Sequence, residues 1–189
     1  MAEVHVLAAG YAGDRVGSTV SLIRCDEATI VVDPGMVASQ ALILDPLERL
    51  GIAAQDVTDV VISHHHPDHT INVGLFPRAR VHDHWAIYLG DEWISRPAEG
   101  FEVAAGVTLW ETPGHTPQDI TTIVEDDGSV TALTHLWWHR SGPDEDPYAT
   151  DMAALRAARI RVLEVATLII PGHGSPFVPE ELTRSPGQY

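Results

Sequence analysis

Short apolar runs separated by glycines and acidic turns dominate the first part of the chain and predict a sheet. Gly10, Gly13 and Gly17 separate the first two runs, and the polar pair Asp26-Glu27 separates the second from the third. Such spacing is typical of a meander of neighbouring strands. The expected strands are Val4–Ala9, Ser18–Arg24 and Ala28–Val32.

A different periodicity follows over residues 41–50. Ile43, Leu47 and Leu50 recur at helical spacing, and a glycine comes directly after the last of them. Pro46 is tolerated in such a helix near its start or at a kink. We therefore expect a helix that covers one face of the sheet.

The rest of the chain returns to short strands. The run Val60-Val61-Ile62 is continuously apolar, which favours a strand buried on both faces. Asp126-Asp127-Gly128 is typical of a hairpin turn. The further expected strands are Asp59–Ser63, Ala79–Asp83, Phe101–Val103, Val107–Glu111, Ile120–Glu125, Val130–Leu133 and Thr167–Ile170.

A second helix is expected after Thr150, which we interpret as its N-cap. Several apolar residues mark its buried side, and arginines occupy the rest of its surface. The expected buried residues are Met152, Leu155, Val162, Leu163 and Ala166.

The 189-residue length predicts a single domain over residues 1–189, with a loose tail from about residue 178. Mean hydropathy is near zero, and no segment approaches the roughly 20 apolar residues that cross a bilayer, so no membrane association is expected. A lone cysteine, Cys25, and an N-terminus without a basic and apolar leader favour the cytoplasm.

The net charge of −16 argues against nucleic acid as a partner. Proteins that bind phosphate backbones carry basic patches, and lysines and arginines here occur singly or in pairs. Solubility or adaptation of the host explains the acidity most simply, and steering of a substrate is the alternative.

Residues 64–69, His-His-His-Pro-Asp-His, concentrate metal-binding side chains where a predicted strand ends. Imidazole and carboxylate groups suit Zn, Mn and Fe. An engineered tag or a low-complexity tract also places histidines side by side. The run is internal, however, and Pro67 and Asp68 interrupt it, so we predict a metal site.

Three further histidines follow predicted strands: His115, His135 and His173. A glycine precedes His115 and His173, which permits a tight turn that aims the side chain from the end of a strand. Together with residues 64–69, these positions predict one shared site.

At these positions the chain resembles the metallo-β-lactamase-fold superfamily of hydrolases. Its HxHxDH signature is complete in residues 64–69. Residues 31–35 resemble the turn that follows a strand in the family, and residues 112–116 and 171–174 resemble its third and last ligand segments. The resemblance therefore extends over nearly the whole chain. The resemblance implies an α/β (α+β) fold, a four-layer αββα sandwich. It leaves the substrate open, because the superfamily includes thioesterases, lactonases, nucleases and redox enzymes.

The resemblance implies two ligand sets. They are His64, His66 and His115 in the first set, and Asp68, His69 and His173 in the second. His135 departs from the family, which usually has a bridging aspartate there. One imidazole lone pair cannot bridge two cations as a carboxylate does. His135 ligates the second ion, which we favour, or it points away, or the protein works with a single ion.

The remaining candidates have supporting roles. The resemblance implies that Asp33 holds metal ligands through hydrogen bonds. His65 is expected to be structural, a metal pair at His82 and His84 lacks further partners, and Cys25 has no nearby base. The residues expected to line a substrate pocket are Phe76, Trp85, Trp137, Trp138 and His139.

The function expected is metal-dependent hydrolysis of a small ester, thioester, lactone or amide, with Asp68 as the catalytic residue that orients the attacking water or moves its proton. Two zinc ions are the expected cofactors, with one ion, or Mn or Fe, as alternatives. A phosphodiesterase or nuclease, and a metal-binding sensory module without catalysis, are the rival hypotheses. The oligomeric state is open, and a homodimer is one arrangement.

Overall fold

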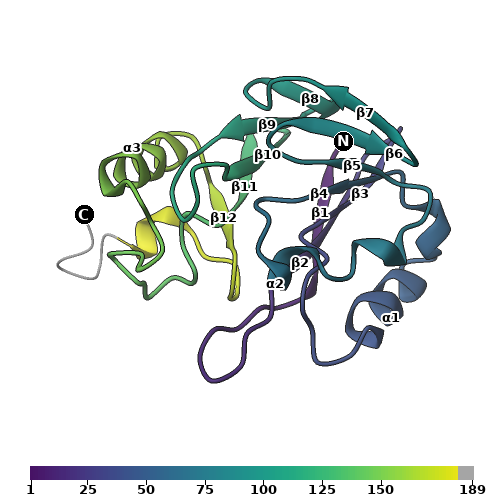
Figure 1. The fold of residues 1–189 in the computed structure, drawn as a ribbon, viewed down its shortest axis with the longest axis horizontal. Coiled ribbons are helices and arrows are strands. Elements are labelled where there is room, and N and C mark those ends of the chain that lie inside the picture. Colours follow the sequence, from purple (N-terminus) through teal and green to yellow (C-terminus); the bar gives the residue numbers. More distant parts are fainter. Residues whose placement is uncertain (183–189) are drawn as a thin grey trace.

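Two β-sheets pack face to face in this computed structural model, which describes residues 1–182 (Figure 1). The first sheet has seven strands in the order of the sequence, and the second has five, in the order β12-β11-β10-β9-β8. The strands of the first sheet are β1 (Glu3–Ala8), β2 (Val20–Arg24), β3 (Thr29–Val32), β4 (Asp59–Val61), β5 (Arg80–His82), β6 (Ala86–Leu89) and β7 (Glu92–Ser95).

The second sheet comes from the second half of the chain, and the helices are divided between the two halves. The strands are β8 (Phe101–Ala104), β9 (Val107–Glu111), β10 (Ile120–Asp126), β11 (Ser129–Thr134) and β12 (Leu168–Pro171). The α-helices are α1 (Ala41–Arg49), α2 (Pro67–Thr70) and α3 (Met152–Leu163), and the 3-10 turns are Ala54–Asp56, Val73–Leu75 and Pro179–Glu181.

Strand direction gathers the ends of several strands at one edge of the sandwich. β3 and β4 are parallel, with Val32 opposite Val61, and β11 and β12 are parallel, with Thr134 opposite Pro171. Parallel neighbours end at the same edge of their sheet, and their connecting loops begin there. The segments that follow these four strands contain most of the metal-ligand candidates.

Alternation along the strands divides the core into layers. Ile30 and Val32 of β3 belong to the core between the sheets, whereas Val31 faces the other way and packs in a cluster with Ile43 and Leu47 of α1. On the other side, α3 covers the outer face of the second sheet. The arrangement is helix, sheet, sheet, helix, which confirms the four-layer αββα sandwich.

One element was missed by the sequence patterns, and one local prediction was wrong. The sequence did not reveal the hairpin of β6 and β7 at the edge of the first sheet; all four residues of β7 are exposed, so no buried alternation marks it. Helix α3 is capped by Asp151 rather than Thr150, and the Asp151 carboxylate accepts hydrogen bonds from the amides of Ala153 and Ala154.

The first residues of the expected loose tail are among the described residues and pack against the fold. Pro179–Glu181 forms a 3-10 turn, and Leu182 is buried in the cluster beneath α3. The remainder of that tail, residues 183–189, lies outside the described residues. Within residues 1–182, none of the helices has the length and apolar character needed to span a membrane.

Candidate metal centre

Asp33 sits in a strained turn directly after β3 and anchors the histidine-rich segment. Its φ of 50° is in the left-handed region that non-glycine residues rarely adopt. Its carboxylate accepts hydrogen bonds from the Ser63 amide and hydroxyl, both at 2.7 Å, and lies 2.9 Å from His69 Nδ1. The resemblance to the superfamily implies this supporting role for Asp33.

Glycine at position 35 allows this turn to press against α2. A Cβ atom there would lie 1.6 Å from the Asp68 carbonyl oxygen, so any other residue would push the two segments apart. The Met36 amide donates a hydrogen bond to the same carbonyl oxygen at 2.9 Å. The turn after β3 therefore fixes the position of the segment that contributes Asp68 and His69.

The side chains of the first ligand set that the resemblance implies lie close together. His66 Nδ1 lies 3.1 Å from His64 Nε2 and 3.0 Å from His115 Nε2. His64 and His115 are buried, and His66 is partly exposed. Nitrogens this close together repel if each is protonated, whereas neutral rings can direct their lone pairs at one shared cation.

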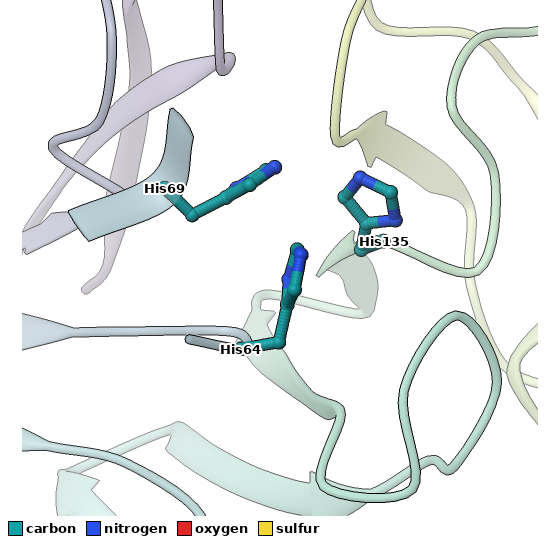
Figure 2. Close-up of side chains that lie close together, drawn as sticks. All are labelled: His64, His69 and His135. Carbon is teal, nitrogen blue, oxygen red and sulfur yellow. The ribbon is translucent and has the colours of Figure 1, made fainter. Parts of the chain in front are cut away.

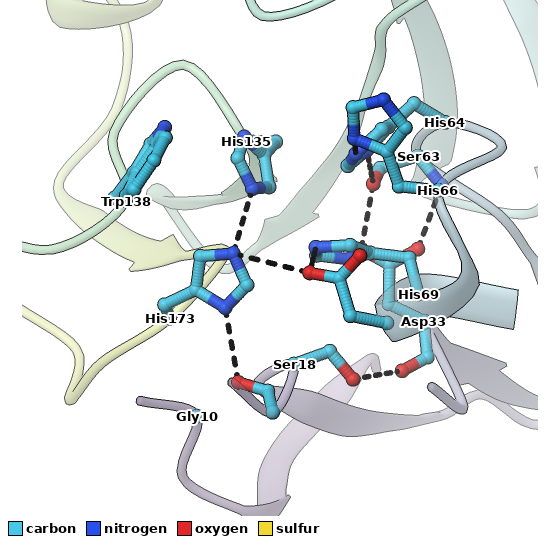
Figure 3. A network of polar contacts seen from close by, with 12 residues as sticks. Gly10, Ser18, Asp33, Ser63, His64, His66, His69, His135, Trp138 and His173 are labelled. Carbon is cyan, nitrogen blue, oxygen red and sulfur yellow. Dashed lines mark hydrogen bonds and ion pairs between the residues drawn. The ribbon is translucent and has the colours of Figure 1, made fainter. Parts of the chain in front are cut away.

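The second set forms beside the first (Figure 3). Asp68 Oδ2 lies 3.5 Å from both His69 Nε2 and His173 Nε2. His173 Nδ1 donates a hydrogen bond to the Gly17 carbonyl oxygen at 3.0 Å, which leaves the lone pair of Nε2 facing Asp68. One carboxylate and two imidazoles therefore face a common space.

His135 lies between the two sets rather than pointing away from them. Its Nε2 is 3.0 Å from His173 Nε2, and its ring centroid is 4.6 Å from that of His64 and 4.8 Å from that of His69 (Figures 2 and 3). A Cβ atom at Gly172 would lie 2.3 Å from the His135 ring. Glycine at that position therefore makes room for the histidine.

These donors fit divalent metal ions. His69 Nε2 and His135 Nδ1 are buried and have no hydrogen-bond partner. Burial lowers the pKa of His64 and of His135 well below the ordinary value, and the neighbouring histidines lower both further, so their rings are neutral at pH 7. Buried neutral imidazoles with unpaired nitrogens that face one another provide the lone pairs that a cation requires.

Asp146 is a buried residue at the site that the sequence did not reveal. Its Oδ2 lies 2.8 Å from His115 Nδ1 and accepts a hydrogen bond from Trp138 Nε1 at 2.7 Å, and its Oδ1 accepts one from the Tyr148 amide at 2.9 Å. Burial alone would raise its pKa, but these hydrogen bonds outweigh burial and hold the pKa below the usual range. No local sequence pattern marks such a contact, because His115 precedes Asp146 by 31 residues.

A cavity of about 420 Å³ opens onto both ligand sets. An isolated β-bridge between the backbones of Tyr11 and Gly17 closes a loop, and this loop forms one wall of the cavity. Trp138 and Tyr148, stacked 5.9 Å apart with 17° between their planes, form another wall. The lining residues are Ala12, Gly13, Val16, His66, Pro67, Asp68, His115, Trp138, Tyr148 and His173.

Of the five residues expected to line the pocket, the structure places Trp138 there. Phe76 and Trp137 are instead buried in the clusters beneath α1 and α3, because their aromatic rings fill the spaces between helix and sheet. Trp85 packs against His65 and is 45% exposed. His139 forms an isolated β-bridge with Gly142 and is not among the residues that line the cavity.

The other histidines have partners away from the centre. His65 Nε2 lies 2.9 Å from Asp83, and His82 Nε2 lies 2.7 Å from the buried Asp59. Across residues 1–182, neither His82 nor His84 belongs to a group of three side chains arranged to hold a metal. The structure thus keeps these residues separate from the two ligand sets.

Comparison with known families settles the relationship that the fold and the ligands indicate. The family model of the metallo-beta-lactamase superfamily matches residues 13–175, and this range includes both ligand sets and His135. The chain belongs to this superfamily. A frog relative, metallo-beta-lactamase domain-containing protein 1 of Xenopus laevis, is 34% identical over 93% of the chain and 81% of its own length. The mouse protein of the same name is 35% identical over 85% of the chain, which spans 65% of the mouse protein.

Solved structures share the metallo-β-lactamase fold. A putative metallo-beta-lactamase from Thermotoga maritima superposes with a TM-score of 0.75 at 20% identity, over 94% of this chain and 99% of that one. TTHA1623 in a di-iron-bound form gives 0.70 at 20% identity, over 94% and 97%. An N-acyl homoserine lactone hydrolase with its product bound at the catalytic metal centre gives 0.64 at 20% identity, over 91% and 92%.

Proposed function

We propose that this chain is a metal-dependent hydrolase that cleaves an ester, thioester, lactone or amide bond in a small molecule. One observation carries the proposal: the two ligand sets meet at the floor of a cavity that is large enough for a small substrate. His64, His66 and His115 would hold one ion. Asp68, His69 and His173 would hold a second ion, with His135 as an additional ligand.

The chemistry that divalent ions supply in such a centre is the acidification of a bound water and the polarisation of a carbonyl oxygen. The side chain of Asp68 is 17% exposed and faces the cavity. Its carboxylate is therefore placed to orient the attacking water, accept a proton from it and donate that proton to the leaving group. Asp33 and Asp146 hold the rings of His69 and His115, so the ligands need not reorganise during the reaction.

Zinc is the cofactor we propose, with manganese or iron as alternatives. Six of the seven candidate ligands are imidazoles and one is a carboxylate, a donor set that all three metals accept. The di-iron form of one structural neighbour supports keeping iron as an alternative. Two ions are proposed. Because an imidazole cannot bind two cations at once, His135 would serve the second ion alone.

Charge favours a small carbonyl substrate over a nucleic acid. The cavity lining contains neither lysine nor arginine, and the chain has a net charge of −16. A long polyanion would therefore meet repulsion without a basic surface to release its counterions. The lactone hydrolase among the structural neighbours supports placing lactones among the first substrates to test.

The decisive experiment measures bound metal per chain and then turnover after reconstitution with Zn, Mn or Fe. The substrate panel consists of a lactone, a thioester and bis-nitrophenyl phosphate. We expect hydrolysis of a carbonyl substrate that disappears on chelation and in His115→Ala. Cleavage of the phosphodiester alone would replace the proposal with nuclease chemistry, and metal binding without any turnover would favour a sensory module.

A further inference from the structure

Asp146 connects the first ligand set to the wall of the cavity. Its carboxylate receives three hydrogen bonds, from the His115 ring, the Trp138 indole and the Tyr148 amide. We propose that Asp146 is a positioning residue that orients His115 toward the first metal ion and fixes the aromatic wall beside it. The inference rests on the proposed function to the extent that it needs a metal at this centre.

The orientation of His115 follows from its two ring nitrogens. Nδ1 lies 2.8 Å from Asp146 Oδ2, and a carboxylate can only accept, so Nδ1 carries the proton. Nε2 is then unprotonated and directs its lone pair toward His66 Nδ1, 3.0 Å away. A carboxylate behind a ligand histidine fixes the tautomer and raises the basicity of the nitrogen that faces the metal.

The same carboxylate holds the Trp138 ring and the backbone of Tyr148, the two aromatic residues of the cavity wall. Trp138 Nε1 donates to Oδ2 at 2.7 Å, and the Tyr148 amide donates to Oδ1 at 2.9 Å. The Tyr148 ring stacks on Trp138 and lies 5.3 Å from the His115 ring, although the residue is 61% exposed. Without Asp146, the exposed Tyr148 would lose a hydrogen bond that positions its backbone against the site.

A competing role is direct metal ligation, because donor atoms of His115, His135 and Asp146 lie within 4.8 Å of one another. The observed contacts favour positioning. A carboxylate has about four lone-pair sites, and three of them are used here. His115 and Trp138 both donate to Oδ2, so one site on Oδ1 is the only one left for a cation.

The test compares Asp146→Asn with Asp144→Asn in the full chain. Asparagine keeps the size of the side chain, but its amide has one acceptor oxygen and cannot receive all three hydrogen bonds. Asp144 lies two residues away with an exposed side chain, so its variant removes the same charge without touching the site. Zinc affinity is measured by competition with a chromophoric chelator, and tryptophan exposure by acrylamide quenching of the metal-free protein.

We expect Asp146→Asn to bind one zinc ion about 10- to 100-fold more weakly, and to show increased tryptophan quenching, while the other ion binds with unchanged affinity. Asp144→Asn should match the wild type in both measurements. Cobalt loaded to saturation should give the same visible absorption spectrum in Asp146→Asn and wild type, because the ligands themselves are unchanged. A different spectrum would overturn the positioning role in favour of ligation.

Wild-type zinc affinity in Asp146→Asn, or an equal loss in Asp144→Asn, would also overturn the inference. If Asp146→Asn does not fold, Asp146→Glu carries the same test, because it keeps the charge and displaces the carboxylate by one methylene. None of these measurements uses a substrate. A chain that behaves as expected here but hydrolyses nothing would therefore defeat the proposed function and leave the role of Asp146 standing.

Discussion

His135 Nε2 lies 3.0 Å from His173 Nε2, with both rings buried. Two imidazole nitrogens at this distance need a proton or a cation between them, since two lone pairs repel. Burial and the neighbouring histidines lower the pKa of both residues, and the Gly17 carbonyl opposes this only at His173. A doubly protonated, cationic ring is therefore disfavoured. A neutral His135 can donate its Nε2–H to His173 Nε2, or a bound cation can accept the lone pairs of both nitrogens.

Replacement of His135 should act on one metal ion. We expect His135→Ala to retain the first ion and to bind the second at least about 100-fold more weakly, since a direct ligand contributes more than its supporting partners. His135→Asp, which supplies a carboxylate able to bridge, should restore two ions per chain. Metal content after dialysis checks both variants, and two tightly held ions in His135→Ala would contradict the ligand role.

His66 and His115 should be required for metal binding but much less for folding. His66 is partly exposed, so its removal leaves little buried space unfilled. We expect His66→Ala and His115→Ala to lose the first ion and to keep the circular dichroism spectrum of the wild type. The matched control is His65→Ala, because His65 faces Asp83 instead of the centre. Full metal content in His66→Ala would refute the assignment.

Asp33 should influence both stability and metal binding. In Asp33→Asn the side chain keeps only one acceptor oxygen. It therefore cannot accept all the hydrogen bonds that Ser63 and His69 make to the two carboxylate oxygens of Asp33. Loss of buried charge-assisted hydrogen bonds should lower the free energy of unfolding of the metal-free protein by about 2 kcal/mol. Urea titration in the presence of a chelator measures this change. An unchanged midpoint together with unchanged zinc affinity would show that Asp33 has no supporting role.

Asp119 makes stability depend on pH. Burial raises its pKa to about 6, although hydrogen bonds from Thr116 oppose the shift. The folded pKa lies above the unfolded value, so the protonated acid is favoured in the fold. Its contribution is fully present below about pH 4 and is lost as the pH rises through about 6. A shift of this size corresponds to roughly 3 kcal/mol.

The check for Asp119 is the difference in unfolding free energy between Asp119→Asn and wild type, measured without metal from pH 4 to pH 7. Asparagine does not titrate, so this difference should move in favour of the variant as the pH rises. Subtraction removes the contribution of the other titrating groups. A difference that stays constant across this range would contradict the raised pKa.

Cys25 should be dispensable for hydrolysis. It follows β2 in a turn where burial raises the pKa of its thiol, so little thiolate forms at neutral pH. We expect Cys25→Ser to retain metal content and turnover, and iodoacetamide to leave the wild type active. Loss of turnover on alkylation that Cys25→Ser prevents would place this thiol in the reaction.

Most strands, helix α1 and the segments that contain the candidate ligands could be predicted from the sequence because they depend on local patterns. Apolar runs followed by histidines mark the ends of β4 and β12, and helical spacing marks α1. Those signals are confined to a few neighbouring residues. The order of the layers follows from them once the resemblance to the superfamily is included.

The sequence could not predict contacts that tertiary packing alone creates. Asp146 lies in an irregular segment of polar residues, and its bond to His115 exists because two distant loops meet. Phe76 and Trp137 were misplaced for a related reason, since an aromatic residue near a predicted site can fill either a core or a cavity wall. The exposed hairpin of β6 and β7 carries no buried periodicity.

The ligands come from both sheets, and this division has a consequence for biosynthesis. Residues 64–69 follow β4 of the first sheet, whereas His135 and His173 follow β11 and β12 of the second. A ribosome must therefore release nearly the entire chain before the second ion can find its full set of donors. Metal uptake would then be a late event that joins the two sheets, and a truncated product lacking β12 and the segment after it would be unable to complete the second set of candidate ligands.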